Sequence, residues 1–121
     1  FNAAASFIAS PIFDGEEMLG VLVFQMPVDE INRRLLVEEG LGKSGEVYLV
    51  GPDKLMRSQS RFSEENTILA TKIETVTALD AIAGNEGAEI TPDYCGINVL
   101  SAYAPLDIKG LDWIILAEID E

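Results

Sequence analysis

The chain has 121 residues, which suits one domain with one core, and its 48% hydrophobic and 24% charged residues are typical of a globular protein rather than a disordered one. Its formal net charge of −13 repels phosphate backbones and anionic lipids, so we expect no nucleic-acid partner. With no histidine and one cysteine, it lacks the usual general base and metal ligands, and no internal disulfide can form. We therefore expect no enzyme activity, no metal and no cofactor.

The first part of the chain predicts a hairpin and a helix. Two apolar runs at 4–13 and 19–26 flank a turn sequence at 14–17, a pattern typical of two antiparallel strands. Pro27 ends the second strand, and the apolar residues after it recur at helical spacing, with charged pairs four residues apart on the opposite face. We expect a helix of about three turns that ends near Gly40.

A second hairpin is expected in the middle of the chain. Short β-rich runs at 46–50 and 55–58 are separated by the turn formers at 51–53. The polar stretch 59–72 has no clear periodicity and predicts a surface loop, of the kind that often covers a binding site.

The last part of the chain predicts one helix followed by three strands. Thr71 and Glu74 match a capping box, apolar residues follow at helical spacing, and Gly84 supplies a stop. The strands are expected at 87–91, 97–104 and 111–119. Cys95 is expected to be a turn residue between the first two. Short connections make neighbouring strands antiparallel, so the fold class is α+β, and apolar residues on both sides of the last strand predict cover on both of its faces.

Four stretches carry a resemblance to a known family: 45–53 (GEVYLVGPD), 55–62 (LMRSQSRF), 94–103 (YCGINVLSAY) and 113–120 (WIILAEID). Their order and spacing resemble PAS-like Cache sensor domains, as found in the periplasmic regions of methyl-accepting chemotaxis proteins and of cyclase-linked receptors. The resemblance implies a central antiparallel sheet of about five strands flanked by helices. It also implies that 1–121 is a single sensor domain, a fragment of a larger membrane receptor. The family's long N-terminal helix is missing from this fragment, so we expect an exposed apolar patch or a homodimer contact in its place.

In such domains the ligand lies between the central sheet and the segment that crosses it, which points to 46–62 and 97–104. The candidate ligand-binding residues there are Tyr48, Arg57, Ser58, Ser101 and Tyr103. Aromatic rings would wall a pocket, and hydroxyls would orient a small polar molecule. The planar guanidinium of Arg57 can bind a carboxylate through two hydrogen bonds, so an amino acid or another carboxylate is the expected ligand.

The same residues also have simpler, purely structural interpretations. Each tyrosine also suits the core with its hydroxyl paired. Arg57 and Arg61 also suit ion pairs with Asp53, Glu64 or Glu65 that only fix the loop.

The expected function is extracytoplasmic small-molecule sensing and transmembrane signal transduction, in a chemotaxis or cyclase-type receptor of the inner membrane. A cytoplasmic PAS domain is a further alternative, which differs from this expectation in location alone. The alternative is a ligand-free, membrane-proximal structural or dimerisation module of a tandem sensor. What occupies the space beside Tyr48 and Tyr103 discriminates between the two hypotheses. If leucine, methionine and phenylalanine side chains fill it, the alternative is favoured.

Overall fold

The computed structural model describes residues 4–121 as two separate antiparallel sheets and two short helices. A two-stranded hairpin is formed by β1 and β2, and the main sheet has the strand order β3-β6-β5-β4. The elements are β1 (Ser6–Asp14), β2 (Glu17–Met26), α1 (Val28–Leu35), β3 (Glu46–Val50), α2 (Val76–Ile82), β4 (Gly87–Pro92), β5 (Asn98–Pro105) and β6 (Ile114–Asp120). No helix within the described residues is long and apolar enough to span a membrane.

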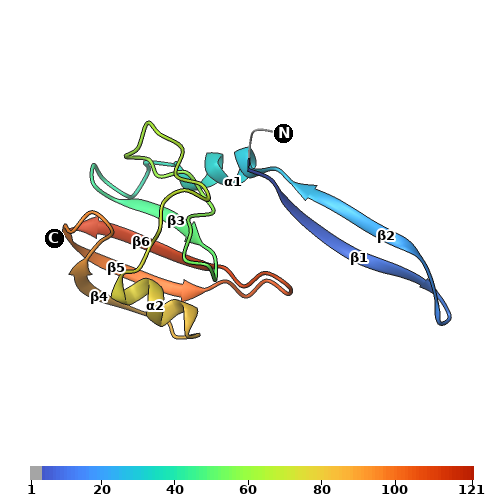
Figure 1. Cartoon of the computed structure of the whole chain (residues 1–121). Coiled ribbons are helices and arrows are strands. Elements are labelled where there is room, and N and C mark those ends of the chain that lie inside the picture. The colour runs from blue at the N-terminus through green and yellow to red at the C-terminus, as the bar shows by residue number, and fades with distance from the viewer. Residues whose placement is uncertain (1–3) are drawn as a thin grey trace.

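The first hairpin forms as expected but extends away from the rest of the protein (Figure 1). Gly15 makes the tight turn with a positive φ of 60°. Large apolar side chains are exposed on both faces of the hairpin; Phe7 and Phe24 are each 62% exposed. Its charged residues lie only at the turn, in the stretch 14–17. The hairpin therefore lacks the charges that commonly protect a free sheet edge.

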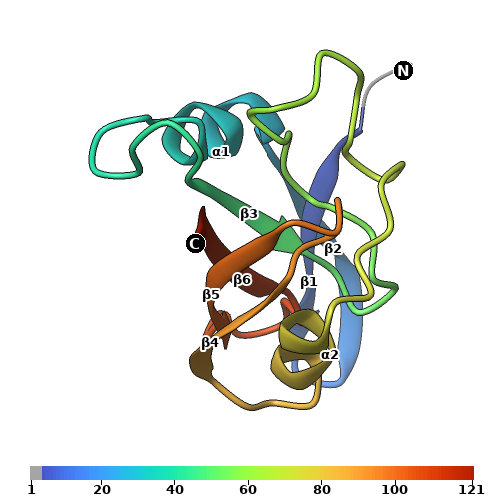
Figure 2. The ribbon, with the colours of Figure 1, turned by 90° about the vertical axis from the view of Figure 1, so that its left-hand side faces the viewer.

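The core lies on one side of the main sheet. There α2 and the long connection 51–75 cover the sheet (Figure 2), and their side chains meet the inward residues of β3 and β6. The buried cluster consists of Tyr48, Val50, Met56, Ile73, Ala78, Ala81, Ile114 and Leu116. The main sheet is therefore antiparallel with helical cover, as the α+β prediction required.

The expected strand at 55–58 does not form, so the main sheet has four strands rather than five. Arg57 N–H still donates to Leu49 C=O, but the other side of this segment bonds to residues 69–72, as in Met56 N–H to Thr71 C=O. Met56 is fully buried, and the segment fills the core instead of extending the sheet.

Three further expectations were wrong in detail. On β6 only the side carrying Ile114 and Leu116 is fully buried; the opposite side is half-buried and borders a shallow apolar depression. The N-cap of α2 is Thr75 rather than Thr71, because the Thr75 hydroxyl accepts a hydrogen bond from Ala78 N–H. The first helix ends at Leu35, short of Gly40, and the connection to β3 runs through turns.

Candidate ligand site

Two glutamates face each other in the buried part of the main sheet. Glu46 begins β3 and Glu118 lies near the end of β6, and the antiparallel register places them directly opposite one another. Strand alternation puts Glu118 on the same side as Leu116, so both carboxyl groups point into the covered face. Their exposed fractions are 5% and 4%, which is unusual for two acidic side chains.

Hydroxyl groups, rather than cations, surround the two carboxylates. Glu118 accepts hydrogen bonds from the Tyr48 hydroxyl at 2.9 Å and the Ser101 hydroxyl at 2.8 Å. Glu46 accepts from Ser60 at 2.9 Å and from the Tyr94 hydroxyl. Within residues 4–121 neither glutamate makes an ion pair. The site thus holds two desolvated acidic groups with neutral donors only.

Burial dominates the electrostatics of this cluster. Desolvation raises the pKa of Glu118; the nearby Asp93 and Glu46 carboxylates raise it further, while the Ser101 and Tyr48 hydroxyls oppose the rise. Burial likewise raises the pKa of Tyr48, with the Glu118 charge adding to the effect. Tyr48 is therefore a neutral hydrogen-bond donor throughout the physiological pH range.

A cavity of about 330 Å³ opens beside the carboxylate pair. Phe62, Tyr94 and Val99 give it apolar walls, and Lys43 and Asp120 stand at its margin with Cys95, which is exposed. Such mixed lining suits a small molecule that carries both charge and apolar surface. No group of three or more Asp, Glu or Cys side chains suited to a metal ion is present in the described part of the chain.

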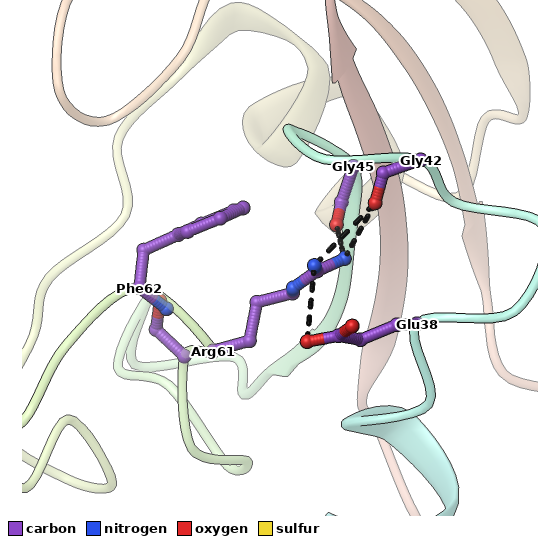
Figure 3. A network of polar contacts seen from close by, with 6 residues as sticks. Glu38, Gly42, Gly45, Arg61 and Phe62 are labelled. Atoms are coloured by element: carbon purple, nitrogen blue, oxygen red, sulfur yellow. Dashed lines mark hydrogen bonds and ion pairs between the residues drawn. The ribbon is translucent and has the colours of Figure 1, made fainter.

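Arg61 fixes the wall that carries Phe62 (Figure 3). Its guanidinium donates to the carbonyl oxygens of Gly42 and Gly45, lies 3.6 Å from a Glu38 carboxylate oxygen and sits 5.0 Å from the Phe62 ring centre. A side chain at Gly45 would collide with the Leu41 carbonyl, so glycine is required at this close approach. Arg61 thereby ties the segment over the cavity to the connection before β3.

The structure brings together only two of the five residues predicted from sequence. Tyr48 and Ser101 are fully buried and converge on Glu118. Ser58 is also buried, but its hydroxyl accepts the Leu49 N–H and so shapes the backbone.

Arg57 and Tyr103 lie elsewhere. Arg57 donates to Asp53 at 2.7 Å and stands 5.8 Å from the Trp113 ring centre, so it makes the ion pair that the simpler interpretation named. Tyr103 donates to Asp80 of α2 at 2.8 Å. Arg61 pairs with Glu38 rather than with Glu64 or Glu65.

The sequence reasoning missed Glu46, Glu118, Ser60 and Tyr94. A signal was present: both glutamates occupy inward positions of strands whose other inward residues are apolar, which is where a charged side chain needs a partner.

Comparisons with known proteins give the fold. No family model matches the sequence, and no curated protein matches it. The periplasmic sensory domain of the Campylobacter jejuni chemoreceptor Tlp1 superposes with a TM-score of 0.73 and 19% identity, over 97% of this chain and 43% of that one. The Pseudomonas aeruginosa PctC ligand-binding domain superposes with a TM-score of 0.68 and 16% identity, over 96% of this chain and 49% of that one. The Pseudomonas fluorescens CtaA ligand-binding domain superposes with a TM-score of 0.61 and 12% identity, over 95% of this chain and 46% of that one.

These identities establish the fold alone. The chain has the α+β fold of Cache-type periplasmic sensor domains, with a four-stranded antiparallel sheet, a hairpin and two short helices. It spans less than half the length of each of these three solved domains.

Proposed function

From this fold we propose that the chain is a module of the extracytoplasmic part of a transmembrane receptor, and that it binds a small ligand with an ammonium group beside Glu46 and Glu118. One observation supports the ligand class: two buried carboxylates that have no cationic partner in the described part of the chain border a cavity. An ammonium group would neutralise them and donate hydrogen bonds to them.

Three features agree with an amino acid or amine as the ligand. The PctC domain was solved with GABA, PctB with L-Gln and CtaA with L-leucine, and each of these molecules carries an ammonium group. The cavity volume is adequate for such molecules. The exposed Lys43 at the cavity margin could meet the carboxylate of an amino acid.

Signal transmission is part of the same proposal. β6 carries both Glu118 and Asp120, so a ligand at the cavity acts directly on this strand. A ligand that prefers one position of β6 would bias the receptor between two states, with chemotaxis or a cyclase as the output.

The test is thermal denaturation with GABA, L-alanine, L-glutamine and ethylamine, with propionate as a control that lacks the ammonium group. At about one hundred times Kd a ligand adds about 2.7 kcal/mol to stability. We expect a shift with at least one ammonium compound and none with propionate. We also expect the response to be lost in Asp120→Asn. Lys43→Met should lose the response to the amino acids but keep a response to ethylamine, and Arg57→Ala should keep every response.

Two outcomes would contradict this assignment. If Arg57→Ala abolishes the response while the cavity variants keep it, the ligand binds at the Arg57 site predicted from the sequence. No shift with any ammonium compound contradicts ligand binding by this chain.

A second candidate function is a ligand-free structural or dimerisation module of a tandem sensor. The space around Tyr48 is filled by Met56, Ile73 and Leu116, with Tyr103 packed against this cluster. The exposed apolar hairpin adds a surface on which a second copy could pack. Light scattering after size-exclusion chromatography would support this function if the chain is a stable dimer that responds to none of the compounds above, and would count against it if the chain is a monomer.

A further inference from the structure

The helix α1 makes one hydrogen bond to the body of the protein. None of its residues is buried, and its ion pairs both involve Glu30 and stay within the helix. Beyond its own caps, the one hydrogen bond from α1 to another part of residues 4–121 is made by Asn32, whose Oδ1 accepts the Gln59 N–H at 2.9 Å. Asparagine is a poor helix former, so its place in this short helix agrees with a role in that contact.

Gln59 closes the segment after it into a compact loop, here called the wall loop (59–67). Its side-chain amide donates to the carbonyl oxygens of Ser63 at 3.1 Å and Glu65 at 2.8 Å, and its Oε1 accepts the Thr67 N–H at 3.1 Å. Both ends of the amide are therefore satisfied within the loop, which fixes the orientation of the side chain. We expect a loop closed in this way to shift as one piece.

The wall loop reaches the cavity through Ser60 and Phe62. Ser60 Oγ donates to Glu46 at 2.9 Å and lies 3.0 Å from the Tyr94 hydroxyl. The same oxygen accepts the Phe62 N–H at 3.2 Å, and Phe62 lines the cavity. Gln59 and Ser60 share a planar peptide bond, so the group that binds α1 and the group that binds the cavity wall are covalent neighbours. A displacement of Gln59 is therefore passed to Ser60 directly.

We propose that Asn32 is a positioning residue for the cavity, through which α1 and the hairpin joined to it set the place of the wall loop. α1 lies between the hairpin and the main sheet (Figure 1), and β2 leads into it across Pro27. A change in the direction of the hairpin moves α1, and the hydrogen bond between Asn32 and Gln59 carries that movement to Ser60 and Phe62. Because coupling between two sites is reciprocal, a change at the cavity acts on α1 in turn. This connection is separate from the one through β6.

A second set of contacts gives the competing explanation. Arg61, within the wall loop, donates to the Gly42 and Gly45 carbonyl oxygens and lies 3.6 Å from a Glu38 carboxylate oxygen. If these contacts fix the wall loop by themselves, removal of the Asn32 side chain leaves the loop unchanged. The two explanations therefore differ in the effect of a substitution in α1.

Amide hydrogen exchange, followed by NMR in the ligand-free 121-residue protein, tests the coupling. Asn32→Ala removes the accepting oxygen but keeps the helix, because alanine has the higher helix propensity. The Ser60 and Phe62 N–H groups should then exchange roughly two- to tenfold faster, the factor that matches the loss of one hydrogen bond. Exchange at the Ala78 N–H, which is bonded at the N-cap of α2, should stay as in the wild type. Unchanged exchange at Ser60 and Phe62, or equal acceleration at Ala78, would overturn the proposal.

Two more variants separate positioning from a general effect on α1. Asn32→Asp keeps an oxygen that can accept the Gln59 N–H, so it should restore wild-type exchange in the wall loop. Arg34→Ala is the matched control: its side chain is 77% exposed on α1, and its loss should leave the wall loop unchanged. The ring signals of Tyr94, which belongs to the turn after β4 and contacts Ser60, should shift in Asn32→Ala and return in Asn32→Asp. If Tyr94 does not respond in this way, or if Arg34→Ala acts like Asn32→Ala, Asn32 does not position the cavity wall.

The use of this coupling in sensing rests on the proposed function, but its test does not. All of these measurements are made without a ligand. An absence of ammonium binding would therefore contradict the proposed function and leave the measured coupling of α1 to the wall loop in place. Conversely, wild-type exchange in Asn32→Ala would refute the coupling while ligand binding stands.

Discussion

Replacing Arg61 by methionine should destabilise the protein by about 2 kcal/mol, because the guanidinium holds two segments together. The side chain is only 11% exposed and donates to the Gly42 and Gly45 carbonyl oxygens. A hydrogen bond from a charged donor contributes about 1.5–3 kcal/mol. The bonds to Gly42, at 3.4 Å, are long and belong at the bottom of that range. The Glu38 contact adds little, because Glu38 is 80% exposed.

Calorimetry and urea denaturation measure this loss, which corresponds to a Tm lower by roughly 8 °C in a chain of this size. Hydrogen exchange should also accelerate at Gly45 N–H, which donates to Leu41 C=O. Arg33→Met is the matched control: Arg33 is 75% exposed and pairs within α1, so its loss should cost less than about 0.5 kcal/mol. If Arg61→Met is as stable as Arg33→Met, Arg61 does not fix the cavity wall.

Three further predictions concern packing and pH. Met56→Ala should cost about 2–5 kcal/mol because Met56 is fully buried, whereas Phe24→Ala in the exposed hairpin should change stability by less than about 0.5 kcal/mol; equal losses in urea denaturation would show that the hairpin is packed. Thr75→Ala should cost about 1 kcal/mol through loss of the α2 N-cap, and Thr75→Ser should restore most of it; a silent Thr75→Ala in thermal denaturation would contradict this. Hydrogen bonds from Arg57 and Lys54 hold the pKa of Asp53 and Glu74 low, and one from Tyr103 does so for Asp80. The stability that these carboxylates contribute is complete above their pKa values in the unfolded state, about 4, and is lost as the pH falls through their lower pKa values in the folded state. Asp80→Asn should therefore make the Tm fall less steeply with decreasing pH on the acid side of a titration. An unchanged fall would refute this prediction.

Most of the elements could be predicted from local patterns. Alternation and turn residues placed β4, β5 and β6 to within a few residues, because each strand's spacing and its flanking turns are written in consecutive residues. The strand expected at 55–58 failed for a non-local reason: its edge is occupied by residues 69–72, and Met56 fills the core. The prediction of Thr71 as the N-cap failed for the same non-local reason, since Thr71 C=O accepts the Met56 N–H and the helix begins after Thr75.

The candidate site was less accessible to sequence reasoning. Tyr48 and Ser101 are buried, and what they face is a glutamate rather than an open pocket; their role as ligand-binding residues stays a prediction. Arg57 and Arg61 occur in one short run and have similar neighbours in sequence. In the structure Arg57 contacts Asp53 and Trp113, while Arg61 donates to the Gly42 and Gly45 carbonyl oxygens beside the cavity.

The sequence by itself determined the α+β class, the hairpins' turns, the absence of histidine chemistry and the side of each strand on which a residue lies. The tertiary structure alone decided that Glu46 and Glu118, far apart in the chain, lie opposite one another with no ion pair to either within residues 4–121. It also decided that the first hairpin lies outside the main sheet. The physical reason is that periodicity fixes the face of a strand, whereas the register between distant strands depends on how whole faces pack. Whether a buried carboxylate meets a cation, a hydroxyl or a second carboxylate depends on that register.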